Sequence, residues 1–406
     1  MSKTKIFVSA YACEPDHGSE IGVGWHWVLE MSKYFELWVL TRKSNQENIE
    51  QWLAKNPETN EIHFVYYDLP DKLRFWKKGM RGVRTYYNIW QLRTNKIVKQ
   101  TMIENDIKIY HLLTYGNALW KASKFGMKQT FIWGPTGGVD TIPKEYSKHY
   151  TAKARFIEWA RRCVVKMLPI NHGFKKRCKN ADLILCKSYN MQNAVPEKYR
   201  DKAKLFTDVA VDIKEKEVSK ALHHSTKFLA VGKLDAWRGF DLLIEAFALA
   251  LKENENITLD ILGIGMDDER IHRLIQDYGV GSHVNQVGEV KIEKYEEYMR
   301  DCDVVVNPAL KEGAVTVSFD SMAYKKPLIC VDTGGYTRYF TNDYAVVLKR
   351  EGRAKLIREL KIGILKMTDE LVRRQLGEKA FQEGMKYTWE DKGREIEKLI
   401  KDLKRD

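Results

Sequence analysis

The chain has 406 residues, of which 44% are hydrophobic and 30% are charged, a composition typical of folded proteins that excludes a disordered chain. This length suits two domains of roughly 150–200 residues each. No uncharged apolar run approaches the roughly 18 residues that a membrane-spanning helix needs, and the N-terminus lacks a signal-peptide pattern. We therefore expect a cytoplasmic protein.

The six cysteines form no CxxC pair and no regular spacing, which indicates free thiols rather than a disulfide framework or a zinc site. The net charge of +13 is unevenly distributed. Residues 1–205 carry 35 Lys/Arg against 19 Asp/Glu, or +16, and residues 206–406 carry 33 against 36, or −3. Only the first half is basic, so it either faces an anionic membrane or nucleic acid, or has a merely solvated basic face.

Short β-branched or aromatic runs alternate with helical patterns along residues 1–206, the predicted N-terminal domain. The strands expected there are Lys5–Ala10, Glu36–Thr41, Ile62–Tyr67, Lys108–Leu112, Thr130–Trp133 and Leu183–Cys186. Helical patterns such as Gly22–Tyr34 and Tyr86–Glu104 lie between most of them. Strands that alternate with helices indicate a parallel sheet covered on both faces.

Residues 207–225 are rich in Lys and Glu and interrupt this alternation, so we interpret them as a linker. The alternation resumes in residues 226–385, the predicted second domain, and residues 386–406 are expected to be helical. The strands expected in the second domain are Lys227–Val231, Thr258–Leu262, Val284–Val287, Val304–Asn307, Leu328–Val331 and Ala345–Leu348. The predicted fold class is α/β, with two Rossmann-like doubly wound domains facing a central cleft, and ligands are expected beyond the carboxyl ends of the strands.

A glycine-rich loop follows the first strand. It runs from Tyr11 to Trp25, contains Gly18 and Glu20, and leads into a helix. The backbone amides of such a loop are expected to point toward a ligand. The alternative is a tight loop that needs glycine for packing alone.

Two further features of the first half also follow strands. His111 stands at the carboxyl end of its strand, where it either contacts a ligand or is simply a satisfied polar residue of the strand terminus. The loop Trp133–Asp140 contains Gly137 and Gly138 and lies past the next strand. We expect this loop to line the ligand side of the first domain.

Residues 231–239, with the sequence VGKLDAWRG, follow the first strand of the second domain and open into an amphipathic helix. Gly232 permits close backbone approach, and Lys233 and Arg238 place two cations beside a helix N-terminus, a combination that suits a diphosphate. Gly265 belongs to the Gly-Ile-Gly sequence that follows the next strand. Taken alone, this pattern also fits an ordinary basic loop.

Residues 307–323, with the sequence NPALKEGAVTVSFDSMA, place Glu312 on the loop after a strand and Asp320 eight residues later in the next helix. Carboxylates accept hydrogen bonds from vicinal hydroxyls, and the amides of Gly313, Ala314 and Val315 at the helix start are expected to face phosphates. The alternative is two acidic residues that the helix dipole favours without any ligand.

Together these two features, in this order and about 75 residues apart, resemble the retaining glycosyltransferase family 4 of the two-domain GT-B architecture. That family carries a Gly-Arg-Leu…Lys-Gly loop and a Glu-x7-Glu motif. Here Lys233 stands at the position of the family's arginine, and Arg238 stands at the position of its lysine. Asp320 replaces the second glutamate of the motif, and its side chain is one methylene shorter, which affects the expected contact with the ribose. The resemblance covers essentially the whole chain and is most specific over residues 226–345. The sequence of the first glycine-rich loop is similar to that of the same loop in a subgroup of the family that makes bacterial surface polysaccharides.

The resemblance implies a reaction that moves a sugar, with retention of configuration, from a nucleotide-diphosphate sugar to a glycan or lipid-linked acceptor. Lys233 and Arg238 would hold the pyrophosphate at one end, with Glu312 and Asp320 at the other. The implied residues are His111 and Glu312 for catalysis, Gly18, Gly232, Lys233, Arg238, Gly265, Glu312, Gly313, Ala314, Val315 and Asp320 for the donor, and Glu20, Gly137 and Gly138 for the acceptor side. The helix of residues 386–406 would cross back onto the N-terminal domain.

No metal or other cofactor is expected, because the two cations of the loop supply the positive charge. The sequence Asp301-Cys302-Asp303 spells the Asp-x-Asp of metal-dependent glycosyltransferases, but it ends a predicted helix and enters a predicted strand.

Positive charge concentrates in residues 72–108 and 153–179, which predict a peripheral protein on the inner face of the cell membrane. The first stretch holds ten Lys/Arg and two acidic residues, and the second holds nine Lys/Arg. The interleaved apolar residues are Phe75, Trp76, Tyr86, Tyr87 and Trp90 in the first and Phe156, Trp159, Val164, Val165, Met167 and Leu168 in the second. Such mixtures are typical of helices on an anionic leaflet, where each cation contributes roughly 1 kcal/mol.

Two other functions fit parts of the pattern. A nucleotide-sugar epimerase of the same architecture needs no acceptor groove, and the basic aromatic stretches argue against it. A nucleic-acid-binding protein is suggested by the charge alone, since a nucleic-acid groove uses similar residues. We expect no nucleic acid, because the second half carries the pattern of a nucleotide-sugar site.

Overall fold

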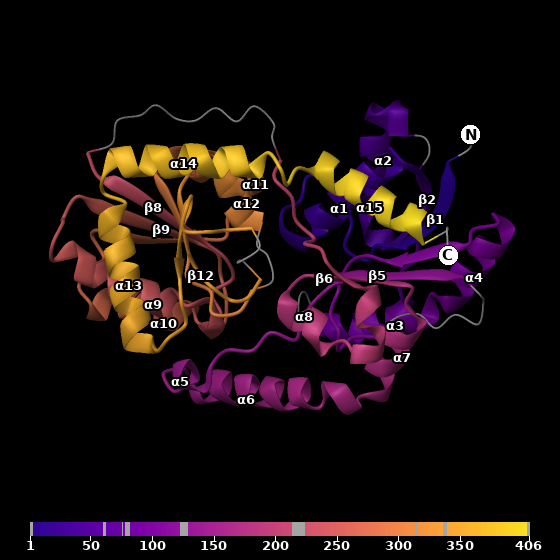
Figure 1. Ribbon diagram of the computed structural model, residues 1–406, viewed down its shortest axis with the longest axis horizontal. Coiled ribbons are helices and arrows are strands. Elements are labelled where there is room, and N and C mark those ends of the chain that lie inside the picture. Colours follow the sequence, from indigo (N-terminus) through magenta and orange to yellow (C-terminus); the bar gives the residue numbers. More distant parts are fainter. Residues whose placement is uncertain are drawn as a thin grey trace. The chain divides into compact units, whose positions relative to one another are not determined.

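The computed structural model describes residues 3–59, 62–74, 76–77, 82–121, 129–212, 224–312, 316–335 and 339–403. The chain forms two compact units (Figure 1). Unit 1 comprises Met1–Val139, Lys166–Asp208 and Trp389–Asp406, and unit 2 comprises Asp140–Val165 and Val209–Thr388.

Unit 1 is built on a seven-stranded sheet in the order β3-β2-β1-β4-β5-β6-β7, with every neighbouring pair parallel. Its strands are β1 (Thr4–Ser9), β2 (Phe35–Thr41), β3 (Ile62–Tyr66), β4 (Ile109–Leu112), β5 (Thr130–Thr136), β6 (Leu183–Cys186) and β7 (Ala203–Leu205). The inner strands are buried on both faces, which explains their nearly continuous apolar sequences. The short edge strand β7 was not predicted, because three residues with one exposed lysine give little periodic signal.

Helices cover both faces of this sheet (Figure 1). They are α1 (Ser19–Ser32), α2 (Gln46–Lys55), α3 (Val83–Arg93), α4 (Asn95–Glu104), α7 (His172–Asn180), α8 (Tyr189–Ala194) and α15 (Trp389–Asp402). The last helix packs on the first: the rings of His26 and Trp389 stack with their centroids 5.1 Å apart. The buried Lys392 ammonium donates a hydrogen bond of 2.7 Å to the carbonyl of Thr207. The C-terminal helix therefore belongs to unit 1.

Unit 2 is built on a six-stranded parallel sheet in the order β10-β9-β8-β11-β12-β13. Its strands are β8 (Thr226–Val231), β9 (Ile257–Leu262), β10 (Val284–Gly288), β11 (Val304–Asn307), β12 (Leu328–Val331) and β13 (Ala345–Leu348). Each lies within a residue of the range expected from the sequence. The predicted class of two Rossmann-like α/β domains with parallel sheets is confirmed.

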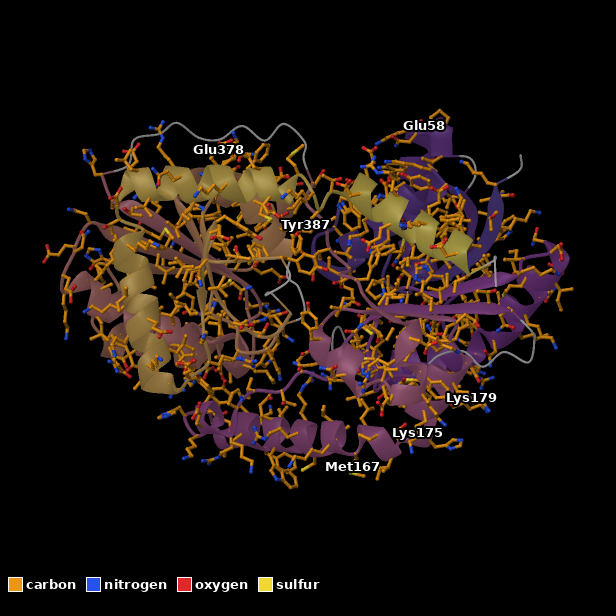
Figure 2. All side chains as sticks on the ribbon, viewed as in Figure 1. Glu58, Met167, Lys175, Lys179, Glu378 and Tyr387 are labelled. Carbon is orange, nitrogen blue, oxygen red and sulfur yellow. The ribbon has the colours of Figure 1, made fainter. Side chains whose placement is uncertain are left out.

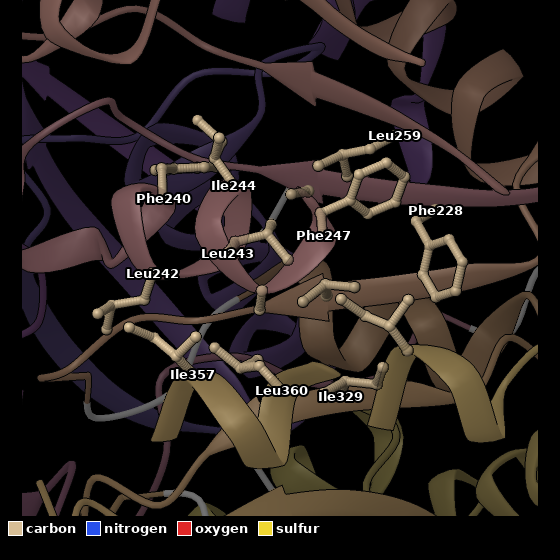
Figure 3. Packing of buried hydrophobic residues seen from close by; sticks show 14 of the residues in the cluster. Phe228, Phe240, Leu242, Leu243, Ile244, Phe247, Leu259, Ile329, Ile357 and Leu360 are labelled. Carbon is tan, nitrogen blue, oxygen red and sulfur yellow. The ribbon is translucent and has the colours of Figure 1, made fainter. Parts of the chain in front are cut away.

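The core of unit 2 is aliphatic and aromatic (Figure 3). Leu242 of α9 lies beside Ile357 of α13, and the ring of Phe247 packs on that of Phe228 with their centroids 6.1 Å apart. The helices that follow β8 in this unit are α9 (Phe240–Leu251), α10 (Asp268–Asp277), α11 (Ile292–Asp301), α12 (Thr316–Ala323), α13 (Arg353–Lys366) and α14 (Glu370–Gly384). Burial of these side chains anchors the strands whose carboxyl ends carry the candidate site.

Residues 140–165 depart from the predicted domain boundary, which kept residues 1–206 together. They contain α5 (Lys144–Ser147) and most of α6 (Ala152–Lys166), and they group with unit 2. Tyr146 and Tyr150 bury their rings in the hydrophobic core of unit 2. Side-chain contacts between distant segments decide this assignment, and neither composition nor periodicity records them.

Each sheet reverses its strand order once. In unit 1 the reversal lies between β1 and β4, and in unit 2 it lies between β8 and β11. Open parallel sheets bind ligands outside the carboxyl ends of the strands at such a reversal. The loops after these four strands are therefore where a site is expected.

Candidate active site

In unit 2 an arginine and a glutamate meet at the reversal of the sheet. Arg238 lies on the loop that follows β8, Glu312 lies on the loop that follows β11, and their side chains form an ion pair. The arginine side chain is 18% exposed and the glutamate 12%, so water screens the pair only weakly. The prediction placed the cations and carboxylates at opposite ends of a ligand, whereas the structure places this cation and this carboxylate in direct contact.

The two loops also touch through their backbones. The Leu310 amide donates a hydrogen bond of 3.0 Å to the Trp237 carbonyl. Gly239 has a φ of 72°, and a Cβ atom there would lie 2.2 Å from the Pro308 carbonyl oxygen. Only glycine accommodates both the left-handed conformation and this approach.

Three further contacts hold the loop that carries Glu312. Arg350 Nη1 donates to the Leu310 carbonyl at 2.7 Å, and Thr333 Oγ1 donates to the Glu312 carbonyl at 2.7 Å. Between them, Lys311 Nζ donates to Glu158 Oε1 of α6 at 2.5 Å. The loop is thus restrained at three consecutive residues, which keeps its carboxylate in place before any ligand binds.

Lys311 is a buried cation. Burial lowers its pKa to about 8, with Arg161 acting in the same direction and Glu158 opposing the shift. Its side chain is 7% exposed and that of Glu158 is 4% exposed. Neither residue was predicted to belong to the site, and the local signal in the sequence was the position of Lys311 beside Glu312.

Lys233 and Asp320, the other two predicted donor residues of this unit, differ from Arg238 and Glu312. The Lys233 side chain is 59% exposed, and its Nζ lies 3.9 Å from Asp235. Asp320 Oδ2 accepts a hydrogen bond of 2.5 Å from the Tyr295 hydroxyl of α11. The predicted residues Gly313, Ala314 and Val315 lie outside the described residues.

The predicted glycines Gly232 and Gly265 lie where the loops after β8 and β9 meet. A Cβ atom on Gly265 would lie 2.2 Å from the Leu234 carbonyl oxygen, so a side chain does not fit there. A Cβ atom on Gly232 would lie 3.6 Å from Nη1 of Arg238, which places this glycine beside the guanidinium. Gly265 therefore shapes the loops, and Gly232 lies next to the candidate site itself.

In unit 1 a second acidic group lies at the reversal of the sheet. Glu20, in the first turn of α1, accepts a hydrogen bond of 2.8 Å from the Tyr115 amide on the loop after β4. Burial raises the pKa of Glu20, Lys187 opposes the shift, and Asp208 adds to it. Lys187 and Asp208 form an ion pair with each other. Gly18 is the exposed residue that caps α1.

The predicted residues Gly137 and Gly138 lie near the same group. A Cβ atom on Gly137 would lie 3.5 Å from Cδ of Lys187. Gly138 has a φ of 86°, and a Cβ atom there would lie 2.4 Å from Nδ2 of Asn117. Lys187, Asp208 and Tyr115 were not predicted, although each follows a strand by one to three residues.

His111 is not where the prediction placed it. It is the third residue of β4 rather than a residue past the strand, and it is fully buried. Its Nε2 lies 2.6 Å from the Gly134 carbonyl oxygen, and burial lowers its pKa to about 4. A neutral imidazole in the sheet interior matches the structural alternative, so we assign His111 no part in the mechanism below.

The Asp-x-Asp sequence is part of the framework of unit 2. Lys227 Nζ binds Asp301 at 2.7 Å, and the Lys227 amide donates to Asp303 Oδ2 at 2.8 Å. Among the described residues, no three His, Cys, Asp or Glu side chains gather as a bound metal ion requires.

The first basic stretch, residues 72–108, buries several of its aromatic side chains. Tyr86, Tyr87 and Trp90 are at most 1% exposed, so the interpretation of these rings as a membrane-facing set is wrong. They pack around the buried ring of Tyr11, which supplies the physical reason. Of the other aromatic residues in this stretch, Phe75 lies outside the described residues.

The site and fold define a class. Residues 212–383 match the protein family described as Glycosyl transferases group 1, and this segment contains β8, β11 and both loops of the Arg238–Glu312 pair. The match lies within unit 2. The two parallel-sheet units have the fold class of the GT-B glycosyltransferases.

Particular relatives agree with this class. The chain is 25% identical over 236 residues to an uncharacterized glycosyltransferase of Methanocaldococcus jannaschii, a match covering 57% of this chain and 62% of that protein. The matched region thus spans less than two thirds of that relative. The solved structure of Anabaena HepE with UDP and glucose has a TM-score of 0.61 at 13% identity, covering 98% and 99% of the two chains. WaaG, a glycosyltransferase of lipopolysaccharide biosynthesis, has a TM-score of 0.61 at 14% identity, covering 97% and 99%.

Proposed function

We propose that this protein is a retaining glycosyltransferase of family 4. It transfers a sugar from a nucleotide-diphosphate sugar to a glycan or lipid-linked acceptor in cell-surface polysaccharide synthesis. The observation that carries the proposal is the Arg238–Glu312 pair at the sheet reversal of a glycosyl transferases group 1 domain. A guanidinium suits the oxygens of a diphosphate and a carboxylate suits vicinal hydroxyls, so one nucleotide sugar spans both groups.

In the proposed reaction the bond between the anomeric carbon and the diphosphate oxygen breaks. The acceptor hydroxyl oxygen forms its bond to the anomeric carbon on the same face, which retains the configuration. The acceptor proton passes to the leaving diphosphate, so atoms and charge balance without a covalent enzyme intermediate.

The charge of the leaving diphosphate needs stabilisation, which Arg238 and Lys233 supply together with the N-terminus of α12. The exposed Lys233 side chain is able to swing onto a phosphate, whereas Arg238 is already restrained. These cations make a metal ion unnecessary in the proposed mechanism. Glu312 orients the sugar. Asp320 accepts a hydrogen bond from the ribose in addition to the one that it accepts from the Tyr295 hydroxyl.

Unit 1 supplies the acceptor side. Glu20, Gly137 and Lys187 surround the carboxyl end of its sheet, where a hydroxyl-rich ligand finds both hydrogen-bond acceptors and donors. We assign Glu20 and the loop of Gly137 and Gly138 to the acceptor.

A panel of donors tests the proposal. Thermal-shift and calorimetric titrations with UDP-glucose, UDP-N-acetylglucosamine, GDP-mannose, ADP-glucose and TDP-glucose should show saturable binding of at least one of them. Glu312→Ala should lose that binding. Retention is read by NMR of the anomeric proton in the product. Binding of none of these donors, combined with steep salt-dependent binding of single-stranded DNA or RNA, would favour the nucleic-acid alternative. Conversion of the sugar without an acceptor would indicate an epimerase.

We also propose that the protein binds the inner face of the cell membrane through α6. This helix buries Glu158 and exposes the opposite face, where Phe156 is 64% and Trp159 55% exposed and their ring centroids lie 5.7 Å apart. Lys153 and Arg155 are exposed on the same helix. Met167 and the exposed lysines Lys175 and Lys179 follow in the chain (Figure 2).

An exposed apolar ridge flanked by lysine and arginine fits an anionic bilayer, because the rings enter the acyl boundary while the cations meet the headgroups. Within the described ranges, no helix is long and apolar enough to cross a bilayer. A peripheral contact of this kind brings the enzyme to a lipid-linked acceptor.

Vesicle sedimentation tests this contact. Wild-type protein should bind vesicles of phosphatidylcholine with one third phosphatidylglycerol, and binding should fall with salt. Phe156→Ser combined with Trp159→Ser should reduce binding about tenfold or more, since two aromatic insertions are lost. Ile362→Ser, which removes a 57% exposed apolar side chain from α13, serves as the matched control. Equal binding by all three proteins would contradict the role of α6.

A further inference from the structure

One ion pair joins α6 to the loop that carries Glu312. Glu158 and Lys311 are 153 residues apart in the chain, and Oε1 of the first lies 2.5 Å from Nζ of the second. Their side chains are 4% and 7% exposed. The buried face of α6 thus delivers a charge to the loop immediately before the candidate sugar-binding carboxylate.

Stability alone does not account for this pair. Two buried charges lose their hydration, and replacing such a pair by apolar side chains of similar volume is often neutral or stabilising. The exposed face of α6 is apolar at Phe156 and Trp159 while its buried face carries Glu158, the reverse of an ordinary surface helix. A buried ion pair in this place therefore points to a requirement for specific geometry.

The geometry continues from Lys311 to Arg238 through one aromatic ring. Lys311 Nζ lies 4.9 Å from the centre of the Trp237 ring, and the Arg238 guanidinium carbon lies 4.4 Å from the same centre. Both distances are within the range of cation–π attraction. Arg238 then pairs with Glu312, so a continuous set of contacts runs Glu158, Lys311, Trp237, Arg238, Glu312.

We infer that Glu158 and Lys311 are positioning residues that hold Glu312 and Arg238 in the geometry that binds the donor sugar. Glu158 fixes the Lys311 ammonium, and the ammonium fixes the loop and the Trp237 ring. The inference rests on the proposed function for the nature of the ligand. It adds two residues, one of them on a distant helix, that a search of the two loops alone does not include.

The test removes the pair without leaving a buried charge. The double variant Glu158→Leu/Lys311→Met replaces both charges by apolar side chains of similar size, whereas Glu158→Gln leaves the lysine without its counter-ion. Lys311→Arg keeps the positive charge as a conservative variant. Glu245→Gln is the matched control, because it breaks the 2.7 Å ion pair of Glu245 with Arg353 in the same unit without touching either loop.

The readout separates sugar from nucleotide. For each folded variant, affinities are measured for the donor selected from the panel and for its nucleoside diphosphate alone. The double variant should bind the donor about tenfold more weakly and its nucleoside diphosphate only about threefold more weakly, because the diphosphate loses the positioning of Arg238 alone whereas the donor also loses that of Glu312. Lys311→Arg and Glu245→Gln should stay within about twofold of the wild type for both ligands. An unchanged donor affinity in the double variant overturns the inference.

A second measurement needs no ligand. Amide hydrogen exchange of residues 309–312 should speed up in the double variant and remain unchanged in Glu245→Gln. Unchanged exchange in the double variant overturns the inference even if the wild type binds none of the donors. Failure of the wild type to bind any donor, with faster loop exchange in the double variant, contradicts the proposed function but leaves the positioning role supported.

Discussion

The two sheet reversals of this protein have the same topology, but the acidic residue at each one has different electrostatic surroundings. In unit 2 the Glu312 carboxylate pairs directly with Arg238. In unit 1 the Glu20 carboxylate accepts the Tyr115 amide, while the nearby Lys187 is paired with Asp208, and burial raises the pKa of Glu20. The first arrangement suits an anionic, hydroxyl-bearing donor, and the second suits an uncharged hydroxyl acceptor. Substitutions at each reversal should separate these two roles.

The largest effect is expected at Glu312. Glu312→Ala should lower kcat/KM for the donor by about two to three orders of magnitude, because a preorganised polar contact to the reacting sugar is lost. Steady-state kinetics with the donor selected from the panel measures this loss. Glu378→Ala, at the exposed Lys325–Glu378 pair of α14, is the control and should retain full activity. A fall of less than tenfold would refute the role assigned to Glu312.

Arg238 should come next. Arg238→Ala should lower donor kcat/KM about a hundredfold, since Glu312 loses its partner and the diphosphate loses its guanidinium. Arg238→Lys should recover part of the loss, because it restores the charge but not the bidentate geometry. Lys233→Ala, at an exposed side chain, should cost only about tenfold. If Lys233→Ala and Arg238→Ala lowered donor kcat/KM equally, the ion pair that holds Arg238 in place would make no difference to donor use.

A substitution at Glu20 should lower catalytic efficiency toward the acceptor without changing the affinity for the donor. Glu20→Gln should lower kcat/KM for the acceptor about tenfold and leave the donor affinity unchanged. Because burial raises the pKa of Glu20, the folded protein binds a proton at this group more tightly than the unfolded chain does. This group therefore costs stability as pH rises through its folded pKa, so the variant should be the more stable protein at neutral pH and should lose that advantage in acid. Thermal unfolding of both proteins between pH 4 and pH 8 checks the sign.

The smallest effect is a pH dependence of stability at Lys311. Its pKa of about 8 lies below the ordinary value, so from pH 8 upward the unfolded chain binds more protons at this residue than the folded one. The free energy of unfolding should then rise with pH by at most about 1.4 kcal/mol per pH unit from this group. The groups that face Lys311 are Glu158 and Arg161 of α6 and Glu312 of its own loop. Denaturant unfolding of the wild type and of Glu158→Leu/Lys311→Met should give different slopes above pH 8, and equal slopes would contradict the assignment.

Several features were predictable because they depend on local pattern. The strands of unit 2 are short β-branched runs between helical periods, and the structure reproduces each of them. Arg238 and Glu312 could be proposed from the sequence because a cation and a carboxylate follow strands at loops where open sheets bind ligands.

Other features were predicted wrongly because the same aromatic residue types occur both in the buried core and on the exposed surface. Tyr86, Tyr87 and Trp90 have the composition of a membrane-facing set, yet they are buried against Tyr11. Phe156 and Trp159 are of the same type, yet they are exposed. Composition does not distinguish these cases, because burial depends on which surface lies opposite each ring.

The sequence by itself determined two parallel α/β domains, the strands that form them and the loops that carry the candidate donor residues, because strand alternation and loop chemistry are encoded within a few residues. Only the tertiary structure decided that residues 140–165 join unit 2, that Glu158 binds Lys311, and that Arg238 meets Glu312 directly. Contacts between residues far apart in the chain depend on how the elements pack, and no short window of sequence contains both partners.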